Sequence, residues 1–108
     1  MIAAFSTLPA VGAPAESVLT IPNGYPPIDL SIPNPVLAIF AAQNAAGGLA
    51  ANGQQGYAIA GQCGAAVAPT GAGEFRITGT RTLGVWNQPN VTSAVIIFYI
   101  AKGSGQET

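Results

Sequence analysis

The residues of this chain that could carry acid–base or nucleophilic chemistry are few and scattered. Histidine is absent, which excludes Ser-His and Cys-His catalytic pairs and removes the commonest zinc ligand. The carboxylates are Glu16, Asp29, Glu74 and Glu107. A glycosidase needs two carboxyl groups across one sugar ring, and Asp29 with Glu74 is only a formal candidate for such a pair. We therefore expect no enzyme activity, no cofactor and no metal.

The single thiol and the three cations are equally sparse. Cys63 lies among small neutral residues, AGQCGAA, whereas a reactive thiolate needs a cationic neighbour or a helix N-terminus. We expect a packed, unreactive thiol. Arg76, Arg81 and Lys102 are too few to neutralise a phosphate backbone, which argues against a nucleic-acid partner. No segment approaches the roughly 20 apolar residues that cross a bilayer, so no membrane partner is expected.

Charge is unusually rare along the 108 residues, a length that fits one domain. Charged residues make up 6% of the chain, against about 25% in typical soluble proteins. Either the surface is neutral but well hydrated, or much of it is covered by other subunits, because extensive interfaces are poor in charge. We favour a subunit of an assembly, with a homo-oligomer expected.

The prolines, which limit where helices and central strands can form, are concentrated in the first third of the chain. Seven of the nine prolines lie within residues 1–35, which excludes a long helix or a central strand there. We expect an extended proline-rich arm over 1–35 with two short strand-like pieces, SVLTIPNG and IDLSIPNP. Each piece is a β-prone run that stops at a turn signal.

The remainder indicates a β-domain over residues 36–103, followed by a tail at 104–108. Residues 36–46 fit either a buried strand or a helix begun by Pro35; the β-like context favours the strand. Large apolar residues run without interruption from Val95 to Ile100, so both faces of that strand are apolar, as in a central strand. The fold class that follows is mainly β, a small antiparallel β-sandwich with the proline-rich arm.

The stretch GEFRITGTRTLGVW, residues 73–86, contains both arginines. Read as one strand, it places Arg81 on the apolar face with Phe75 and Leu83. Arg81 then serves either as an inward charge that blocks edge-to-edge aggregation or as an anchor to a carboxylate of another subunit. A turn around Gly79 would instead make two strands and free the side chain. These alternatives stay open at this level.

Residues 73–103 resemble the C-terminal β-hairpin of small virion proteins of tailed, especially marine, bacteriophages. The matching units are Gly79–Thr82, Trp86, and the closing strand that ends in Tyr99–Gly103. The resemblance covers about 30 residues and implies a structural role in a capsid or tail, as a decoration, cement or head–tail accessory protein. It implies no catalytic residues.

The leading hypothesis is thus a non-enzymatic protein of a bacteriophage virion that decorates or cements the capsid. Its partners would be the major capsid protein or tail proteins, and its location the virion. The residues expected at subunit interfaces are Arg81, Arg76, Trp86, Phe98 and Ile100. The alternative is a carbohydrate- or cell-surface-binding β-sandwich module, in which Trp86 stacks on a sugar ring.

Overall fold

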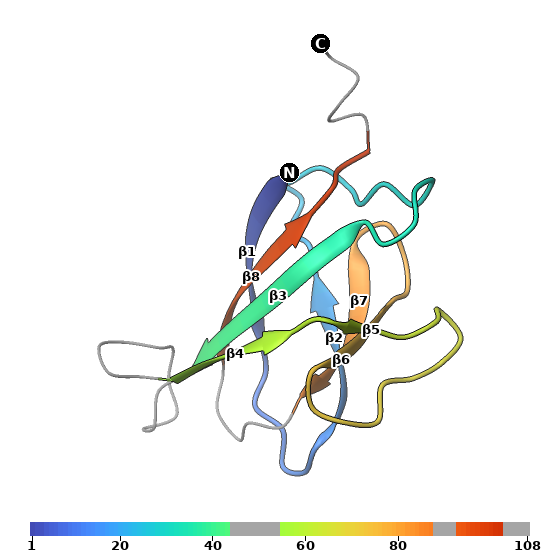
Figure 1. Ribbon diagram of the computed structural model, residues 1–108. Helices are drawn as coiled ribbons and strands as arrows, with labels where there is room; N and C mark the ends of the chain where they lie inside the picture. Colours follow the sequence, from blue (N-terminus) through green and yellow to red (C-terminus); the bar gives the residue numbers. More distant parts are fainter. Residues whose placement is uncertain (44–54, 88–92, 103–108) are drawn as a thin grey trace.

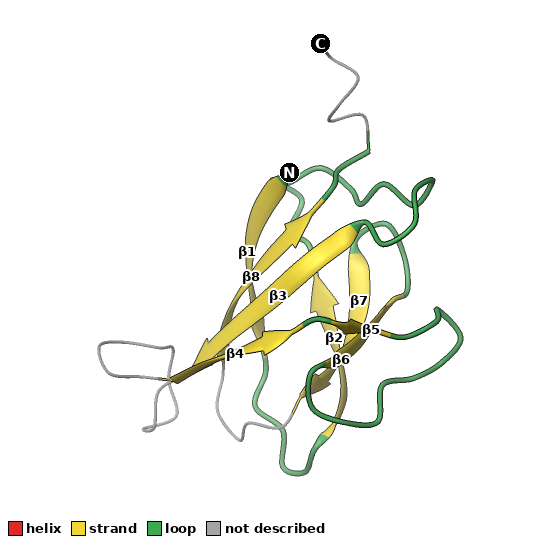
Figure 2. Cartoon of the chain, viewed as in Figure 1, coloured by secondary structure: helices red, strands yellow, loops and turns green. Residues whose placement is uncertain are grey.

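Two four-stranded β-sheets pack face to face in the computed structural model, which describes residues 1–43, 55–87 and 93–102 (Figures 1 and 2). The predicted small β-sandwich is confirmed. The described residues contain no helix long and apolar enough to cross a membrane. The strands are β1 Ile2–Leu8, β2 Ala15–Thr20, β3 Val36–Gln43, β4 Gln55–Ile59, β5 Gly61–Gln62, β6 Glu74–Ile77, β7 Thr82–Asn87 and β8 Ser93–Tyr99.

The strand order places the first and last described strands, β1 and β8, side by side. Sheet A has the order β1-β8-β3-β4 and sheet B the order β2-β7-β6-β5. All pairs are antiparallel except β5 with β6. Pairing β1 with β8 and β2 with β7 gives a nested order like that of a jelly roll. The chain departs from that order where β4 pairs with β3 and β6 with β7.

The proline-rich segment belongs to the sandwich and is not a separate arm. β1 pairs with β8 along its whole length, and β2 pairs with β7 from Ala15 to Thr20. Both are edge strands, and each has a partner strand on one side only. Prolines, which lack a backbone N–H, are tolerated next to such strands because no second ladder of hydrogen bonds is lost. The boundary expected at residue 36 therefore does not separate an arm from a domain, because residues 1–35 supply an edge strand to each sheet.

Of the two strand-like pieces expected in this segment, one forms a strand. Residues 17–24 contain most of β2, whereas residues 28–35 are turns and bends with one isolated bridge, between Ile28 and Ala101. β1 lies outside both pieces. The proline pattern thus predicted where strands stop and gave no sign of the strand that precedes Pro9.

The ambiguous segment from Val36 is a strand, as favoured. β3 pairs with β8 on one side and β4 on the other, with a bulge between Val36 and Ala38. Asn34, two residues before the strand, adopts a left-handed backbone with φ 51°. Residues 44–46 and the expected tail at 104–108 lie outside the described residues.

The stretch of residues 73–86 is a hairpin, not a single strand. β6 and β7 pair in register from Phe75 with Val85 to Ile77 with Leu83. The turn between them closes with the backbone N–H groups of Thr78 and Gly79, which both donate to the Thr82 carbonyl at 3.0 and 3.2 Å. The turn around Gly79 that the sequence allowed is therefore present, and Arg81 lies at its end.

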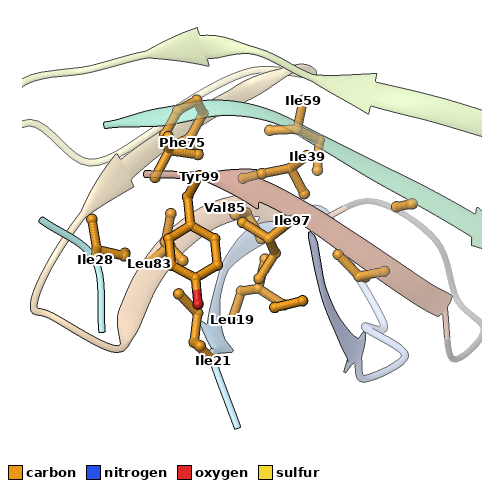
Figure 3. Close-up of a cluster of buried hydrophobic side chains, with 14 of the residues drawn as sticks. Leu19, Ile21, Ile28, Ile39, Ile59, Phe75, Leu83, Val85, Ile97 and Tyr99 are labelled. Atoms are coloured by element: carbon orange, nitrogen blue, oxygen red, sulfur yellow. The ribbon is translucent and has the colours of Figure 1, made fainter. Parts of the chain in front are cut away.

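The core fills the space between the sheets (Figure 3). β8 lies centrally in sheet A, as predicted, and turns alternate residues inward. These inward side chains pack against β7 and β6 of sheet B, because period-2 alternation gives each strand one buried face. The largest fully buried side chains are Tyr99, Phe75, Leu8, Leu19, Ile21, Ile28, Ile39, Ile59, Leu83 and Ile97.

Candidate functional site

The outer face of sheet A, which looks away from the core, consists of the other set of alternate residues. Its described members are apolar or small, and none carries a charged side chain. Strand register assigns to this face Ala3, Phe5, Thr7, Leu37, Ala38, Phe40, Ala58, Ala94, Ile96 and Phe98.

Cross-strand register aligns the large side chains of this face into a row. Phe5 of β1 lies opposite Ile96 of β8, which lies opposite Phe40 of β3, which in turn lies opposite Ala58 of β4. The next row contains Phe98, whose ring meets Phe40 edge to face with centroids 5.8 Å apart and planes at 78°. Such pairs are favourable beyond their buried area. The row therefore spans all four strands of sheet A.

This face leaves large apolar side chains in water. Phe5 is 64% exposed, Phe40 is 46% exposed, and Leu37 at the β3 bulge is 50% exposed. Four strands about 4.8 Å apart and about seven residues long cover on the order of 400 Å². Contiguous apolar patches of a few hundred Å² on a monomer commonly mark contact surfaces. The arrangement is suited to binding an apolar surface of another protein.

The outer face of sheet B has a different chemistry, centred on an ion pair. The Arg76 guanidinium donates from Nε and Nη2 to the two carboxylate oxygens of Glu16, at 2.7 and 2.9 Å. Arg76 Nη1 also donates to the Ala65 carbonyl at 3.2 Å. The hydrogen bond to Glu16, together with the negative charge of Glu16, raises the pKa of Arg76 above its ordinary value. The ion pair links β2 to β6 across β7.

Gly84 of β7 makes this crossing possible. It lies in register with Val18 and Arg76, between the two partner strands. A Cβ placed on Gly84 would lie 1.8 Å from Glu16 Oε2, far inside contact distance. The carboxylate therefore occupies the space that a side chain at this position would take.

Arg81 binds backbone carbonyls of its own chain. Its Nη1 donates to the Tyr25 carbonyl at 2.7 Å and to the Pro22 carbonyl at 3.1 Å. The backbone carbonyl of Arg81 accepts from the Ile21 N–H at 2.8 Å. The half-buried guanidinium thus holds residues 21–28, which we call the proline turn, against the β6–β7 hairpin. This role needs no second subunit.

Tyr99 and backbone pairs fix the same turn from sheet A. The buried Tyr99 Oη donates to the Pro26 carbonyl at 2.5 Å. The Ile28 N–H donates to the Thr80 carbonyl at 2.8 Å, and the Lys102 N–H to the Pro27 carbonyl at 2.9 Å. Burial raises the pKa of the Tyr99 phenol above its ordinary value of 10.0. Residues 21–28 therefore close one end of the sandwich by bonds to both sheets.

The five residues expected at interfaces do not gather on one surface. Phe98 lies on the outer face of sheet A, and Ile100, half-buried just after β8, donates its N–H to the Pro35 carbonyl at 2.8 Å. Arg76 and Trp86 lie on the outer face of sheet B, where Trp86 is opposite Glu16. A role for Trp86 in stacking on sugars stays a prediction.

Phe5 and Phe40 are the most exposed aromatic side chains among the described residues, and neither was predicted as a site residue. Their shared row with Ile96 depends on strand register, which one sequence does not display.

Asp29 and Glu74 accept hydrogen bonds from residues close to them in the sequence. Asp29 Oδ1 accepts from the Ser31 hydroxyl and backbone N–H at 2.5 and 2.9 Å, and these bonds lower the pKa of Asp29 below 3.8. Glu74 Oε1 accepts from the N–H groups of Thr70 and Gly71 at 2.8 and 3.0 Å. Among the described residues, no three His, Cys, Asp or Glu side chains form a group that could hold a metal ion.

Comparison with known protein families, with curated proteins and with solved structures finds no match to this chain. The geometry of the outer face of sheet A is therefore the main physical guide to function.

Proposed function

We propose that this chain is a non-enzymatic structural protein of a bacteriophage virion, which decorates or cements the capsid by docking the outer face of sheet A on a neighbouring virion protein. The observation that carries the docking role is the uncharged row of Phe5, Ile96 and Phe40 on a four-stranded sheet, in which both phenylalanines are exposed and Ile96 is half-buried. The virion context rests on the resemblance of residues 73–103. The two parts of the proposal are therefore supported separately.

The two outer faces differ in a way that favours sheet A as the docking surface. On sheet B, the paired charges of Glu16 and Arg76 are already satisfied by each other. On sheet A, the described residues carry no charge that would have to lose its water on binding. Interface cores are depleted in charge and enriched in aromatic residues, which is the composition of the Phe5–Phe40 row. Burying this row would be favourable by about 25 cal/mol per Å² of apolar area.

The experiment measures co-sedimentation of the purified protein with capsids that lack it. Phe5→Ala and Phe40→Ala remove exposed rings from sheet A and are expected to weaken binding about tenfold or more, as at interface hot spots. Val18→Ala is the matched control, because Val18 is 66% exposed on the outer face of sheet B.

Equal weakening by all three variants, or none by any, would remove sheet A as the docking face. A protein that stays monomeric and has no affinity for any shell would contradict the virion role itself.

A further inference from the structure

A groove lined by residues of the loop after Asp29, of β5 and the loop after it, and of the end of β6 lies beside the edge of sheet B. In Figure 1 the two loops lie on the same side of the sandwich. The volume of the groove is about 510 Å³, within the range of ligand sites. The residues that line it include Leu30, Ile32, Ala65, Ile77 and Thr78. None of the lining residues is charged.

The backbone of β6 directs alternate residues to opposite sides. The Phe75 carbonyl accepts from the Cys63 N–H at 2.7 Å, so the backbone carbonyl of Phe75 points toward the β5 side. The Thr78 N–H donates to the Thr82 carbonyl, so the backbone N–H of Thr78 points toward β7. Hydrogen-bonded and non-hydrogen-bonded pairs alternate along an antiparallel ladder. The backbone groups of Ile77 therefore point to the same side as those of Phe75, two residues earlier. The N–H and C=O of Ile77 therefore point away from β7, toward the β5 side.

β5 is too short to form hydrogen bonds with the backbone N–H and C=O of Ile77. It pairs with Glu74 and Phe75, and the chain then turns away at Gly64, whose carbonyl accepts from the Val67 N–H at 2.8 Å. Within the part of the chain that the structure describes, no strand pairs with β6 opposite Ile77. Since Gln62 at the end of β5 and Ile77 of β6 both line the groove, we infer that the groove borders the edge that a longer β5 would have paired, where Ile77 offers one backbone donor and one acceptor.

We propose that this groove binds an extended, uncharged peptide strand of another polypeptide, which adds to the edge of sheet B at Ile77. Strand addition uses main-chain hydrogen bonds for affinity and side-chain pockets for selectivity. Leu30 and Ile32 offer apolar contacts to alternate residues of such a strand. A charged side chain would lose its water beside walls that hold no opposite charge. The surface is distinct from the outer face of sheet A.

The experiment follows backbone amides by NMR while a capped hexapeptide of alternating valine and threonine is added. In the free protein, the Ile77 amide is expected to exchange with solvent faster than those of Arg76 and Thr78, which face β7. Peptide is expected to slow exchange at Ile77 about tenfold at saturation. A hexapeptide with two threonines replaced by lysine, or by aspartate, is expected to bind about tenfold more weakly.

Two tryptophan variants test the location of the site. Ala65→Trp fills the groove wall and is expected to abolish binding, whereas Ala66→Trp alters the adjacent exposed residue that does not line the groove. In both variants the Ala65 carbonyl remains available to Arg76, and thermal unfolding checks that each variant is folded.

Three outcomes would overturn the proposal. They are an Ile77 amide unaffected by millimolar peptide, equal binding by the two tryptophan variants, and protection of Ile77 that depends on protein concentration without peptide. The last would mean that a second copy occupies the edge.

Discussion

Replacing Tyr99 by phenylalanine tests whether the proline turn is held by a buried hydrogen bond. The Tyr99 side chain is 0% exposed, and its hydroxyl donates to the Pro26 carbonyl. The substitution keeps the ring and leaves the carbonyl without this donor. A net hydrogen bond contributes about 0.5–1.5 kcal/mol, and an acceptor left unpaired in the interior costs about 1–3 kcal/mol. Since Pro26 is half-buried and water reaches part of it, we expect a loss of about 1–2 kcal/mol.

The pH dependence of this loss gives a second, independent measurement. The pKa of Tyr99 is raised in the folded chain above 10.0, so folding favours the neutral phenol. That contribution is complete below pH 10 and is lost as the pH rises through the folded pKa. The phenylalanine variant has no such group. The difference in free energy of unfolding between wild type and variant should therefore narrow above pH 10.

Urea unfolding at pH 7 and above pH 10 measures both effects, with Tyr25→Phe as the control at a half-buried tyrosine of the same turn. At pH 7 the midpoint of thermal unfolding should fall by about 5–10 °C. A change below about 0.3 kcal/mol at pH 7 would refute the assignment of the hydrogen bond as a fixing contact. A difference that stays constant through alkaline pH would refute the effect of burial on the Tyr99 pKa.

Two further changes probe the polar contacts of the surface. Gly84→Ala should lower the urea midpoint, because the new Cβ displaces the Glu16 carboxylate from Arg76. In a Glu16→Ala background, Gly84→Ala should instead raise the urea midpoint, since alanine restricts the unfolded chain more than glycine does. A midpoint that falls equally in both backgrounds would contradict this cause. Ser31→Ala should raise the Asp29 pKa part of the way toward 3.8 in an NMR titration, because the hydroxyl bond is its largest lowering cause. The stability that this lowered pKa contributes is present above pH 3.8 and is lost as the pH falls through the folded value; an unchanged Asp29 pKa would refute the role of the hydroxyl.

The interior of the sandwich could be predicted because its strands carry their pattern locally. The run from Val95 to Ile100 is apolar on both faces, and β8 is central in sheet A. Phe75 and Leu83 alternate with polar or small residues, and both are buried. Where a strand is shaped by its own side-chain pattern, one sequence is enough to find it.

The remaining features depend on contacts between distant segments. β1 was hidden because prolines in its surroundings indicate irregular structure, and only its pairing with β8 makes residues 2–8 a strand. The partners of Arg81 are carbonyls at Pro22 and Tyr25, and every residue has a carbonyl, so side-chain types gave no signal. The row on the outer face of sheet A follows from register, which is a property of the assembled sheet.

The pairing of β1 with β8 also shapes how the chain folds. Ile2 lies opposite Tyr99, so the ladder joins segments nearly the whole described chain apart. Contacts of such long sequence separation must overcome a large loop-closure entropy before they stabilise anything, and β-proteins built this way fold in milliseconds to seconds. On a ribosome, β1 would emerge before β8 and would have no partner strand until β8 is synthesised. During that interval Phe5 and the inward residues of β1 are exposed together, which makes the unfinished chain vulnerable to aggregation until β8 has been synthesised.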